Sequence, residues 1–395
     1  SRSDAFEAMR FGPDFAREQA PNVRVLLNAT VTEIIASEAG GRFRLRAASL
    51  DGAQVEVSAS AVVLAASAIE NPRLLLASRS GSDAGLGNDH GVVGRYLMDH
   101  PATQLGYFDR AAAETMTRRF GFQGVPHDGR MHMYMHGLAL SPALQEREKL
   151  LNSALFLLED HAPDDPLIAL KRVAKGDRSR LAADLWTMLR SPIPIIKGIG
   201  IKALQNGRIP PALTKHLLDA VVRFNPNFAV RETLHRGVQY KLLGLRVHGI
   251  TEQVPLADNR VTLGEARDAL GVSRPRVAWR VDDDARRSLL RLGELMADEC
   301  RRTGLPLPAM ESWVSEGRPQ DAPAIDMGHA MGTTRMAEDP RHGVVDRHCE
   351  IHGVPGLFVA GGSVFPTSGH SNPTLMIVAL AIRLAEHLKT DRFRL

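Results

Sequence analysis

The sequence has few cysteines, few aromatic residues and little net charge. It holds only two cysteines, Cys300 and Cys349, in 395 residues. Two cysteines exclude both a framework of several disulfides and a CxxC metal motif. The formal net charge of +4 is too small to indicate a nucleic-acid-binding protein. We therefore expect neither a nucleic acid partner nor a metal site.

Long apolar runs are missing as well. No stretch of 18 or more apolar residues occurs, so the sequence predicts no transmembrane segment. Residues 1–12 have neither the apolar core of a signal peptide nor the form of a natural start, and we expect a cytoplasmic location. With 44% hydrophobic and 24% charged residues, the composition is that of an ordinary globular protein, long enough for two lobes.

The most informative stretch lies near the C-terminus. The apolar run at 357–360 predicts a buried strand, and Gly361 and Gly362 predict a tight turn after it. Asn372 and Pro373 occupy positions typical of the N-cap and the first residue of a helix. That helix is apolar nearly all round from 375 to 382, so we expect it to be buried. Its N-terminus favours a group that carries negative charge.

The N-terminal part predicts a second strand, turn and helix. Residues 61–67 form a continuous apolar run, which predicts a strand buried on both faces. A helix is expected at 68–78, with Pro72 in its first turn. This order describes a βα unit of an open α/β sheet, whose ligand site lies at the carboxyl end of the strand. Three further strands are expected at the alternating segments 23–35, 41–49 and 54–60.

From about residue 102 to 320, alternating strands and amphipathic helices predict an α+β lobe with an antiparallel sheet. Strands are expected at 131–140, at both ends of 245–263 and at 275–283, and a helix follows and ends at Gly304. The alternation in 131–140 places histidines four residues apart on one face. On a strand they are about 13 Å apart, too far to chelate one metal ion, so this face is either a polar sheet face or a cavity wall.

Two features of the middle of the chain admit competing interpretations. Residues 167–224 are basic and helix-like, which fits a solvated face or a surface for a membrane or an acidic partner. The GxGxxA pattern at 198–203, followed by Asp219, matches a dinucleotide fingerprint. The preceding strand would contain Pro192 and Pro194, which a central parallel strand does not accept, so we discount the fingerprint.

Two segments resemble the C-terminal signature of the glucose–methanol–choline (GMC) flavin oxidoreductases. They are HAMGTTRM at 329–336 and GSVFPTSGHSNPTLMIVALAIRLAEHL at 362–388. The resemblance implies FAD as the cofactor. It also implies that His329 and Asn372 flank the flavin ring as the catalytic residues, with His370 as a competitor for the role of Asn372. The segment VGRYLMDHP at 93–101 is similar to the family's link between the flavin lobe and the substrate lobe.

The resemblance also implies further contacts with the cofactor. Val31 would border the adenine of FAD, and the turn before the first helix would lie near the same end. The implied cofactor-binding residues are Val31, Ala65, Ala66, Ser67, Glu70, Gly361, Gly362, Asn372, Pro373 and Thr374. Three other histidines, His342, His348 and His352, lie in a polar, surface-like stretch and are interpreted as incidental.

These patterns predict an α/β FAD-binding (Rossmann-like) lobe, N-terminally incomplete, built from 1–101 and 321–395. Residues 102–320 would form the α+β substrate lobe. A full family member begins with a GxGxxG segment and an acid for the FAD ribose, and neither occurs before residue 22. The chain is then a fragment, one of two chains or a degenerate protein. Retention of the two catalytic positions favours an enzyme whose N-terminal FAD-binding segment is a separate or missing chain.

The predicted function is FAD-dependent oxidation of an alcohol group. Such a reaction requires a hydride acceptor, here flavin N5, and a base for the hydroxyl proton. A histidine is suited as the base because its charge changes near neutral pH, and the resemblance implies that His329 is this general base. The form of the motifs resembles family members that act on sugars, glycosides and polyols. Oxygen, a quinone and a cytochrome subunit all remain open as electron acceptors. The alternative is a non-catalytic binding or assembly subunit that keeps the fold.

Overall fold

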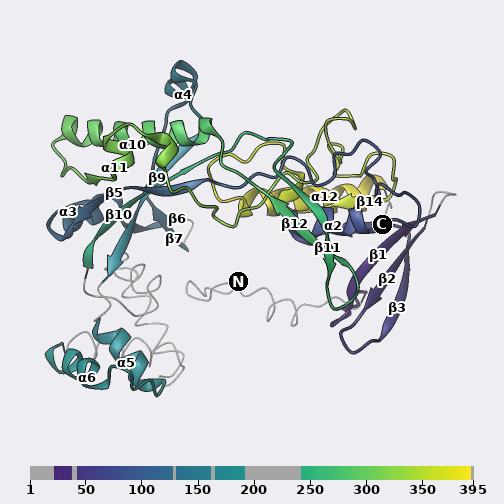
Figure 1. Ribbon diagram of the computed structural model, residues 1–395, viewed down its shortest axis with the longest axis horizontal. Coiled ribbons are helices and arrows are strands. Elements are labelled where there is room, and N and C mark those ends of the chain that lie inside the picture. Colours follow the sequence, from purple (N-terminus) through teal and green to yellow (C-terminus); the bar gives the residue numbers. More distant parts are fainter. Residues whose placement is uncertain (1–21, 38–41, 128–129, 162–164, 192–241, 393–395) are drawn as a thin grey trace.

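The computed structural model describes residues 22–37, 42–127, 130–161, 165–191 and 242–392. The molecule is elongated, with one group of elements at each end (Figure 1). At one end lie three antiparallel strands, a parallel strand pair and the helices beside them. At the other end a larger antiparallel sheet is covered by helices.

The first group combines the N-terminal and C-terminal parts of the described chain. Its elements are β1 (Thr30–Ala36), β2 (Phe43–Ala48), β3 (Gln54–Ala59), β4 (Val62–Leu64), α2 (Ser67–Ala77), β14 (Leu357–Val359), η2 (Gly362–Val364), α12 (Thr374–His387) and η3 (Leu388–Arg392). Strand β4 pairs in parallel with β14, which comes almost 300 residues later, with Val62 opposite Leu357. The two ends of the sequence thus share one strand pair.

The predicted burial of these two strands is confirmed for β14 and wrong for β4. All three residues of β14 are buried. In β4, Val62 and Leu64 are buried, but Val63 between them is 42% exposed. Successive side chains of a strand point to opposite faces, so one face of β4 meets the core and the other lies open.

The three N-terminal strands form an antiparallel sheet in the order β1-β2-β3. The expected strands at 41–49 and 54–60 are confirmed, but the strand expected at 23–35 begins only at Thr30. Thr30 pairs with Ala48, the last residue of β2, after which the chain turns. Residues 22–29 therefore have no strand opposite them, and a β-pattern without a partner does not form a strand.

The second group is built on a five-stranded antiparallel sheet in the order β13-β5-β10-β9-β8, which confirms the predicted α+β lobe with an antiparallel sheet. Its elements are β5 (Ala102–Asp109), α3 (Arg110–Phe120), β8 (Leu138–Ala139), α4 (Pro142–Glu148), β9 (Ser153–His161), β10 (Leu242–Thr251), α10 (Asp283–Thr303), β13 (Ala309–Met310), α11 (Ser312–Ser315) and η1 (Pro319–Asp321). Figure 1 shows α10 lying along one face of this sheet.

Helix α10 follows its sequence signals. The Asp282 carboxylate accepts a hydrogen bond from the amide of Ala285 at 2.8 Å, which satisfies one of the free N–H groups of the first turn. Gly304 ends the helix with a left-handed φ of 66°, as predicted. Its apolar side, from Leu289 to Cys300, contributes to the core of this end.

Two hairpins and two helices complete the described elements. They are β6 (Phe122–His127) with β7 (Arg130–Met135), β11 (Arg260–Arg267) with β12 (Ser273–Ala278), α5 (Pro166–Ala174) and α6 (Leu181–Arg190). The single strand expected at 131–140 is wrong, because β7 and β8 belong to different sheets. Between them lies Gly137, where a Cβ would be 2.8 Å from the Leu155 carbonyl, so a glycine is needed for this close approach to β9.

The predictions for the middle of the chain are tested only in part. Helices α5 and α6 confirm the helix-like character of the first part of 167–224. The GxGxxA pattern at 198–203 lies outside the described residues. Among the helices that the structure describes, none is both long and apolar enough to cross a membrane.

Two separate hydrophobic cores correspond to the two groups of elements. One draws its buried residues from between Ile34 and Val93 and from between Met331 and Leu384. The other draws them from between Leu105 and Ala322. The domain boundaries at 101/102 and 320/321 stay a prediction, which this division supports. The hairpin β11–β12 lies within the predicted substrate lobe but contacts the FAD-binding lobe. Arg73 of α2 binds the Asp268 carboxylate and donates to the Ser273 carbonyl at 2.8 Å.

Helix α2 contains a proline in its interior, and a residue of the C-terminal motif compensates for it. The helix begins at Ser67, so Pro72 is its sixth residue and not, as predicted, in the first turn. Pro72 lacks the N–H that would bond to the carbonyl of Ala68. The hydroxyl of Thr333, fully buried, donates to that carbonyl at 2.6 Å. The motif at 329–336 thus supports the helix of the first βα unit.

This compensation predicts a coupling between Thr333 and Pro72. Thr333→Val keeps the shape and removes the donor, so the free energy of unfolding should fall by about 1–3 kcal/mol, the cost of losing a partner for a buried polar group. Pro72→Ala restores a backbone N–H, so Thr333→Val should cost less in that background. Urea denaturation of the four proteins forms the double-mutant cycle.

The matched control is Thr303→Val, which removes an exposed threonine hydroxyl that also donates to a helical carbonyl, that of Glu299. It should cost little, because water replaces the lost donor. Strictly additive costs for Thr333→Val and Pro72→Ala would contradict the assigned role of Thr333.

Candidate functional site

Three segments that are distant in sequence meet around His329. An antiparallel bridge joins Met98 to Met331, with amide-to-carbonyl distances of 2.9 and 2.8 Å. On the other side, the amides of Gly332, Thr334 and Met336 donate to the carbonyls of Gly362, Ser363 and Val364 at 3.2, 2.9 and 2.9 Å, respectively. The segments 98–101, 329–336 and 361–364 therefore form one backbone-bonded unit.

This unit places His100 beside His329. The Nδ1 atoms of the two rings are 3.0 Å apart, and the rings meet edge to face with their centroids 5.1 Å apart. His100 is fully buried, and its Nε2 lies 3.4 Å from the carbonyl oxygen of Ser368. Burial lowers the pKa of His100, and His329 adds to the effect, so the His100 ring favours its neutral form.

Asp99 fixes the backbone on both sides of the histidine pair. Its buried carboxylate accepts hydrogen bonds from the amides of His100 at 2.7 Å and Met327 at 3.0 Å. The Gln253 side chain accepts from the Asp99 amide at 3.2 Å, and the Gln253 amide donates to the Ser368 hydroxyl at 3.0 Å. The segment that carries His329 and the loop before α12 are thus held to the same framework.

A fully buried asparagine, Asn71, joins the two turns that follow the parallel strands. Its side-chain oxygen accepts from the Ala66 amide at 2.8 Å. Its side-chain nitrogen donates to the Ser363 hydroxyl at 3.0 Å and to the Ala360 carbonyl at 3.3 Å. The carboxyl ends of β4 and β14 therefore keep a fixed relation, and the ligand site of an open α/β sheet lies at such ends.

Neither His100 nor Asn71 is among the site residues predicted from the sequence. His100 was treated as part of a linking segment, and its signal was a histidine between an aspartate and a proline in an otherwise apolar run. Asn71 stands before Pro72 just as Asn372 stands before Pro373. An asparagine at the start of a buried helix, after a strand and a small-residue turn, was a signal for a cross-link.

The structure places the predicted residues of the first turn at the surface. Ala65, Ala66 and Ser67 are exposed, and Ser67 has a left-handed φ of 77°. Such a conformation is strained for a residue with a side chain and is found preferentially at functional sites. Glu70 pairs with Arg73 at 2.9 Å, and Val31 is half-buried on β1. Their predicted contacts with a cofactor stay predictions.

The glycine turn after β14 leaves room for a bound group. Gly361 has φ 110° and ψ −175°, a combination that is essentially restricted to glycine. A Cβ at this position would meet nothing within 4 Å, whereas one at Gly362 would lie 3.3 Å from the Met331 side chain. Gly361 therefore faces open space at the carboxyl end of β14, while Gly362 packs against the motif that carries His329.

Two predictions about α12 are wrong. Its N-cap is Pro373, with no side-chain capping bond, and Asn372 lies exposed one residue earlier. The first intrahelical bond, from the Ile377 amide to the Pro373 carbonyl at 2.9 Å, sets this start. The helix was also expected to be buried, but Leu375 is 78% and Ile382 56% exposed.

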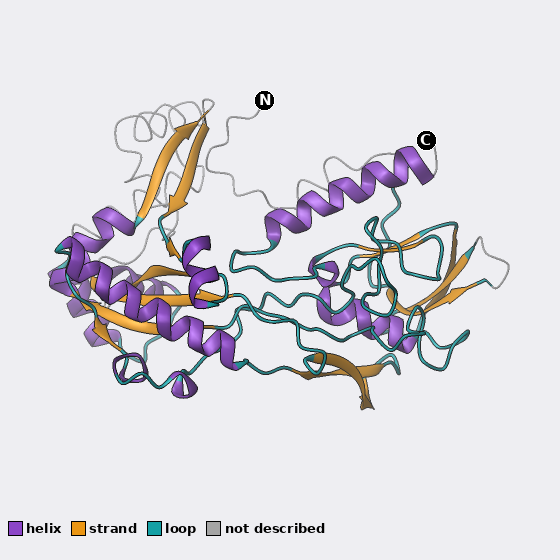
Figure 2. Ribbon diagram, turned by 90° about the horizontal axis from the view of Figure 1, so that it is seen from above, coloured by secondary structure: helices purple, strands orange, loops and turns teal. Residues whose placement is uncertain are grey.

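The exposure of α12 follows from how few described elements reach it. Only Leu384 of the helix is buried, and in Figure 2 the helix that leads to the C-terminus lies along one side of the molecule. Met376 and Val378 are exposed as well. The apolar composition was interpreted as a sign of burial, but no part of the described chain covers this side of the helix.

His370, the competitor of Asn372, is engaged elsewhere. Its Nδ1 lies 2.8 Å from the side-chain oxygen of Asn152, near β9. Burial lowers the pKa of His370, which favours a neutral ring that donates to Asn152. The contact ties the loop before α12 to the antiparallel sheet. Among the described residues, no hydrogen bond involves the side chain of Asn372.

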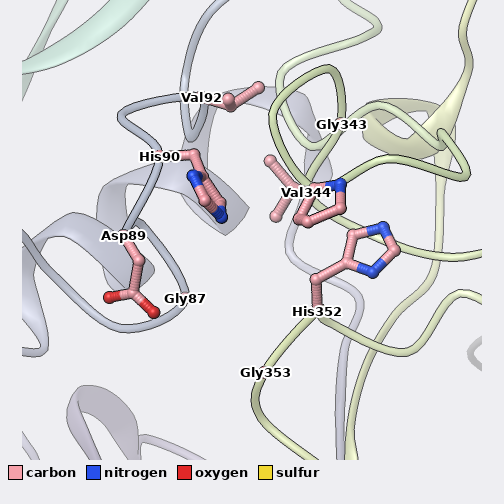
Figure 3. Close-up of a pocket in the computed structure, with 9 residues that line it drawn as sticks. Gly87, Asp89, His90, Val92, Gly343, Val344, His352 and Gly353 are labelled. Carbon is pink, nitrogen blue, oxygen red and sulfur yellow. The ribbon is translucent and has the colours of Figure 1, made fainter.

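A pocket of about 210 Å³ lies apart from these residues, and His90 and His352 project from two of its walls (Figure 3). It contains none of the predicted site residues. The His352 Nε2 is 3.0 Å from the Ala337 carbonyl, which is a structural role. Among the described residues, no three His, Cys, Asp or Glu side chains are grouped as a metal site would require.

Comparisons with known proteins point to one family. Two family models, both described as GMC oxidoreductase, match residues 15–102 and 255–381. The fructose dehydrogenase large subunit of Gluconobacter japonicus is 26% identical over 93% of this chain and 54% of that protein. The 2-methyl-1,2-propanediol dehydrogenase of Mycolicibacterium austroafricanum is 26% identical over 85% of this chain and 49% of that protein. The chain spans about half the length of these relatives.

A shorter match and solved structures agree with this result. A C-glycoside 3-oxidase of Microbacterium trichothecenolyticum is 38% identical over 28% of this chain and 18% of that protein. The crystal structure of pyridoxine 4-oxidase from Mesorbium loti shares the fold, with a TM-score of 0.52 at 18% identity, covering 95% of this chain and 60% of that one. The matched ranges include His100, His329 and Asn372.

The buried histidines predict that stability falls on mild acidification. Burial lowers the folded-state pKa of His100, His248 and His370, whereas an unfolded histidine titrates at about 6.5. The stability these neutral rings contribute is fully present above pH 6.5 and is lost as the pH falls through their lower folded values. The free energy of unfolding by urea should therefore be smaller at pH 5.5 than at pH 7.5.

Ordinary carboxylates, with pKa values near 4, titrate little in this interval. His248→Gln should reduce the pH dependence, because it removes one of the three groups. His90→Gln, at an exposed histidine, should leave it unchanged. A free energy of unfolding equal at the two pH values would refute the assignment.

Proposed function

This chain belongs to the GMC oxidoreductase family, and from that premise we propose that it carries the catalytic side of an FAD-dependent enzyme that oxidises an alcohol group. The observation that supports this most is the backbone-bonded unit of 98–101, 329–336 and 361–364. It brings His329, the first residue of the motif at 329–336, beside the carboxyl end of a parallel strand pair. An alcohol oxidation needs a base held close to a hydride acceptor, and this unit supplies the base.

The residues present fit FAD. Gly361 adopts a glycine-only conformation and faces open space, which leaves room for a planar ring against the turn. The first turn of α12 has no side-chain cap, so its N–H groups and the positive end of its dipole remain available for negative charge. When bound, FAD supplies the acceptor for the hydride. Gly361, Gly362, Asn372, Pro373 and Thr374 would hold its ring end, and Val31, Ala65, Ala66, Ser67 and Glu70 its other end.

The chain's own residues would divide the remaining work. His329 would take the proton of the substrate hydroxyl, as a general base does. Asn372, exposed next to the helix start, would donate its amide N–H to the substrate oxygen and hold the reacting carbon in place. Asp99 and the Met98–Met331 bridge would keep His329 in position.

We propose a sugar, glycoside or polyol as the substrate. The relatives named above are a fructose dehydrogenase subunit, a propanediol dehydrogenase and a C-glycoside oxidase, all names of enzymes acting on polyhydroxylated compounds or diols. The electron acceptor stays open between oxygen, a quinone and a cytochrome. A cytoplasmic location stays a prediction.

Further polypeptide would complete the FAD site, as a segment of the same protein or as a separate chain. The chain spans about half the length of its relatives, and the exposed apolar side of α12 is a surface that such a segment would cover. The word "subunit" in the name of the fructose dehydrogenase relative fits an assembly of more than one chain.

His329→Ala tests the proposed base. In the native protein, with every co-purifying chain, the flavin should still bind, but its anaerobic bleaching by a substrate sugar or polyol should slow by about 10²–10⁴-fold. His342→Ala, at an exposed histidine that lies 3.8 Å from the Asp339 carboxylate, is the control and should bleach at the unchanged rate. Equal rates for the His329 variant and the control would remove His329 from the reaction. A protein that stays colourless with added FAD would instead support a non-catalytic subunit.

Gly361→Ala tests the FAD contact. The new Cβ would enter the space proposed for the ring, and φ 110° would strain the alanine by about 1–3 kcal/mol. We expect the ratio of FAD to protein, measured by absorbance, to fall. Gly317→Ala also places a Cβ at positive φ in open space, but in the other group of elements, and should load FAD normally. Equal loading of the two variants would place FAD elsewhere.

A further inference from the structure

The contact between His100 and His329 leaves one proton to be assigned. Neutral imidazole carries a single N–H, on Nδ1 or on Nε2. The two Nδ1 atoms are 3.0 Å apart, so one must donate and the other accept. The two arrangements differ in consequence. If His100 donates, Nδ1 of His329 carries no proton and the N–H of His329 lies on Nε2. A protonated Nε2 has no lone pair, so this atom of His329 could not act as a base.

The surroundings of His100 select one arrangement. Its Nε2 faces the carbonyl oxygen of Ser368 at 3.4 Å, and a carbonyl oxygen can only accept. If His100 carried its proton on Nδ1, the lone pair of Nε2 would face the lone pairs of that oxygen in a fully buried place. With the proton on Nε2, the ring donates to Ser368 and its Nδ1 is an acceptor.

The position of the Ser368 carbonyl is itself fixed. The hydroxyl of the same residue accepts from the Gln253 amide at 3.0 Å, and the Gln253 side chain is bound by the indole N–H of Trp279 at 2.8 Å. Ser368 is buried. The acceptor that orients His100 therefore does not depend on an exposed, movable loop.

Building on the proposed function, we propose that His100 is a positioning residue that holds His329 in the tautomer with its proton on Nδ1 and a free lone pair on Nε2. The chain of hydrogen bonds runs from His329 Nδ1–H to His100 Nδ1, and from His100 Nε2–H to the Ser368 carbonyl. The atom of His329 that takes the hydroxyl proton of the substrate is thus Nε2. The substrate O–H bond breaks, a bond from Nε2 to the proton forms, and His329 becomes an imidazolium whose Nδ1–H still donates to His100.

The charges around the pair agree with this role. Burial lowers the pKa of His100, and the neighbouring His329 adds to this effect, so the His100 ring favours its neutral form, which can accept. The Asp99 carboxylate opposes this shift, but its hydrogen bonds go to the backbone amides of His100 and Met327 and not to a ring. The nearby His370 also lowers the pKa of His100. The Glu252 carboxylate in turn acts to raise the pKa of His370. His100 is fully buried among the described residues, so the substrate would reach His329 and not His100.

Nitrogen NMR tests the tautomers directly. In protein labelled with ¹⁵N-histidine, two-bond proton–nitrogen correlations at pH 8 distinguish a protonated ring nitrogen from an unprotonated one, and the spectra of the single variants assign the signals. We expect His329 to carry its proton on Nδ1 and His100 on Nε2. A proton on Nδ1 of His100 would overturn the proposal. This result does not require turnover, so it stands apart from the proposed function.

Three substitutions separate the two hydrogen bonds of His100. His100→Asn places an amide oxygen near the position of Nδ1 and keeps the acceptor for His329. His100→Gln places its amide near the position of Nε2 and loses that acceptor, and His100→Leu loses both. In anaerobic flavin reduction by a sugar or polyol, Gln and Leu should lower the maximal rate about 10–100-fold, the range seen when a metal-ligating histidine loses the partner that orients it. The substrate concentration at half the maximal rate should change little. Asn should restore most of the rate.

The pH profile excludes a merely structural effect. His100→Leu removes the acceptor for the Nδ1–H of His329, so the shape of its pH–rate profile should differ from that of the wild type, whereas His100→Asn keeps the acceptor and should keep the shape. Loosened packing would lower the rate by the same factor at every pH, without a change of shape and without rescue by Asn. If His329→Ala slows the reaction but His100→Gln matches the wild type in rate and pH profile, the proposed function stands and the role of His100 fails.

Discussion

The hydrogen bonds that hold residues 331–336 between Met98 and the turn 362–364 are the constraint on which the site depends. They fix the segments 98–101, 329–336 and 361–364 at the carboxyl end of the β4–β14 pair, and more than 200 residues separate the first segment from the second. Backbone bonds of this kind are insensitive to the side chains around them, so the positions of His100 and His329 are set by the fold and not by a mobile loop. Thr333 and Asn71 add side-chain links from the same place to α2.

The same region contains a buried polar network whose hydrogen bonds offset the free-energy cost of removing polar groups from water. Asn71, Asp99, His100 and Thr333 are all buried, and each makes hydrogen bonds that replace those lost to water. A network satisfied in this way defines one arrangement of the chain and excludes others. Each of the two hydrophobic cores stabilises one group of elements, whereas this network joins the segments that form the site.

Much of the fold was predictable from local patterns, and the rest depended on partners that a sequence does not show. The family was identified from 329–336 and 362–388, and β2, β3, α10 and the antiparallel sheet followed from alternation and capping signals. The strand at 23–35 was predicted too long because its partner, β2, ends at Ala48. Pro72 was placed in the wrong turn because a distant residue, Thr333, compensates for it. The exposure of α12 depends on what covers it, which the pattern of apolar residues cannot reveal.

For the candidate site, the sequence indicated His329 through a motif but could not indicate its partner. His100 lies 229 residues earlier, and only the Met98–Met331 bridge brings the two rings together. The most direct test of the account is a crystal structure of the native, flavin-bound protein. We predict that the flavin ring lies against Gly361 and Gly362, with Nε2 of His329 facing its reactive nitrogen and with His329 Nδ1 bonded to His100. A flavin bound elsewhere, or a His329 Nε2 engaged by a protein group, would contradict it.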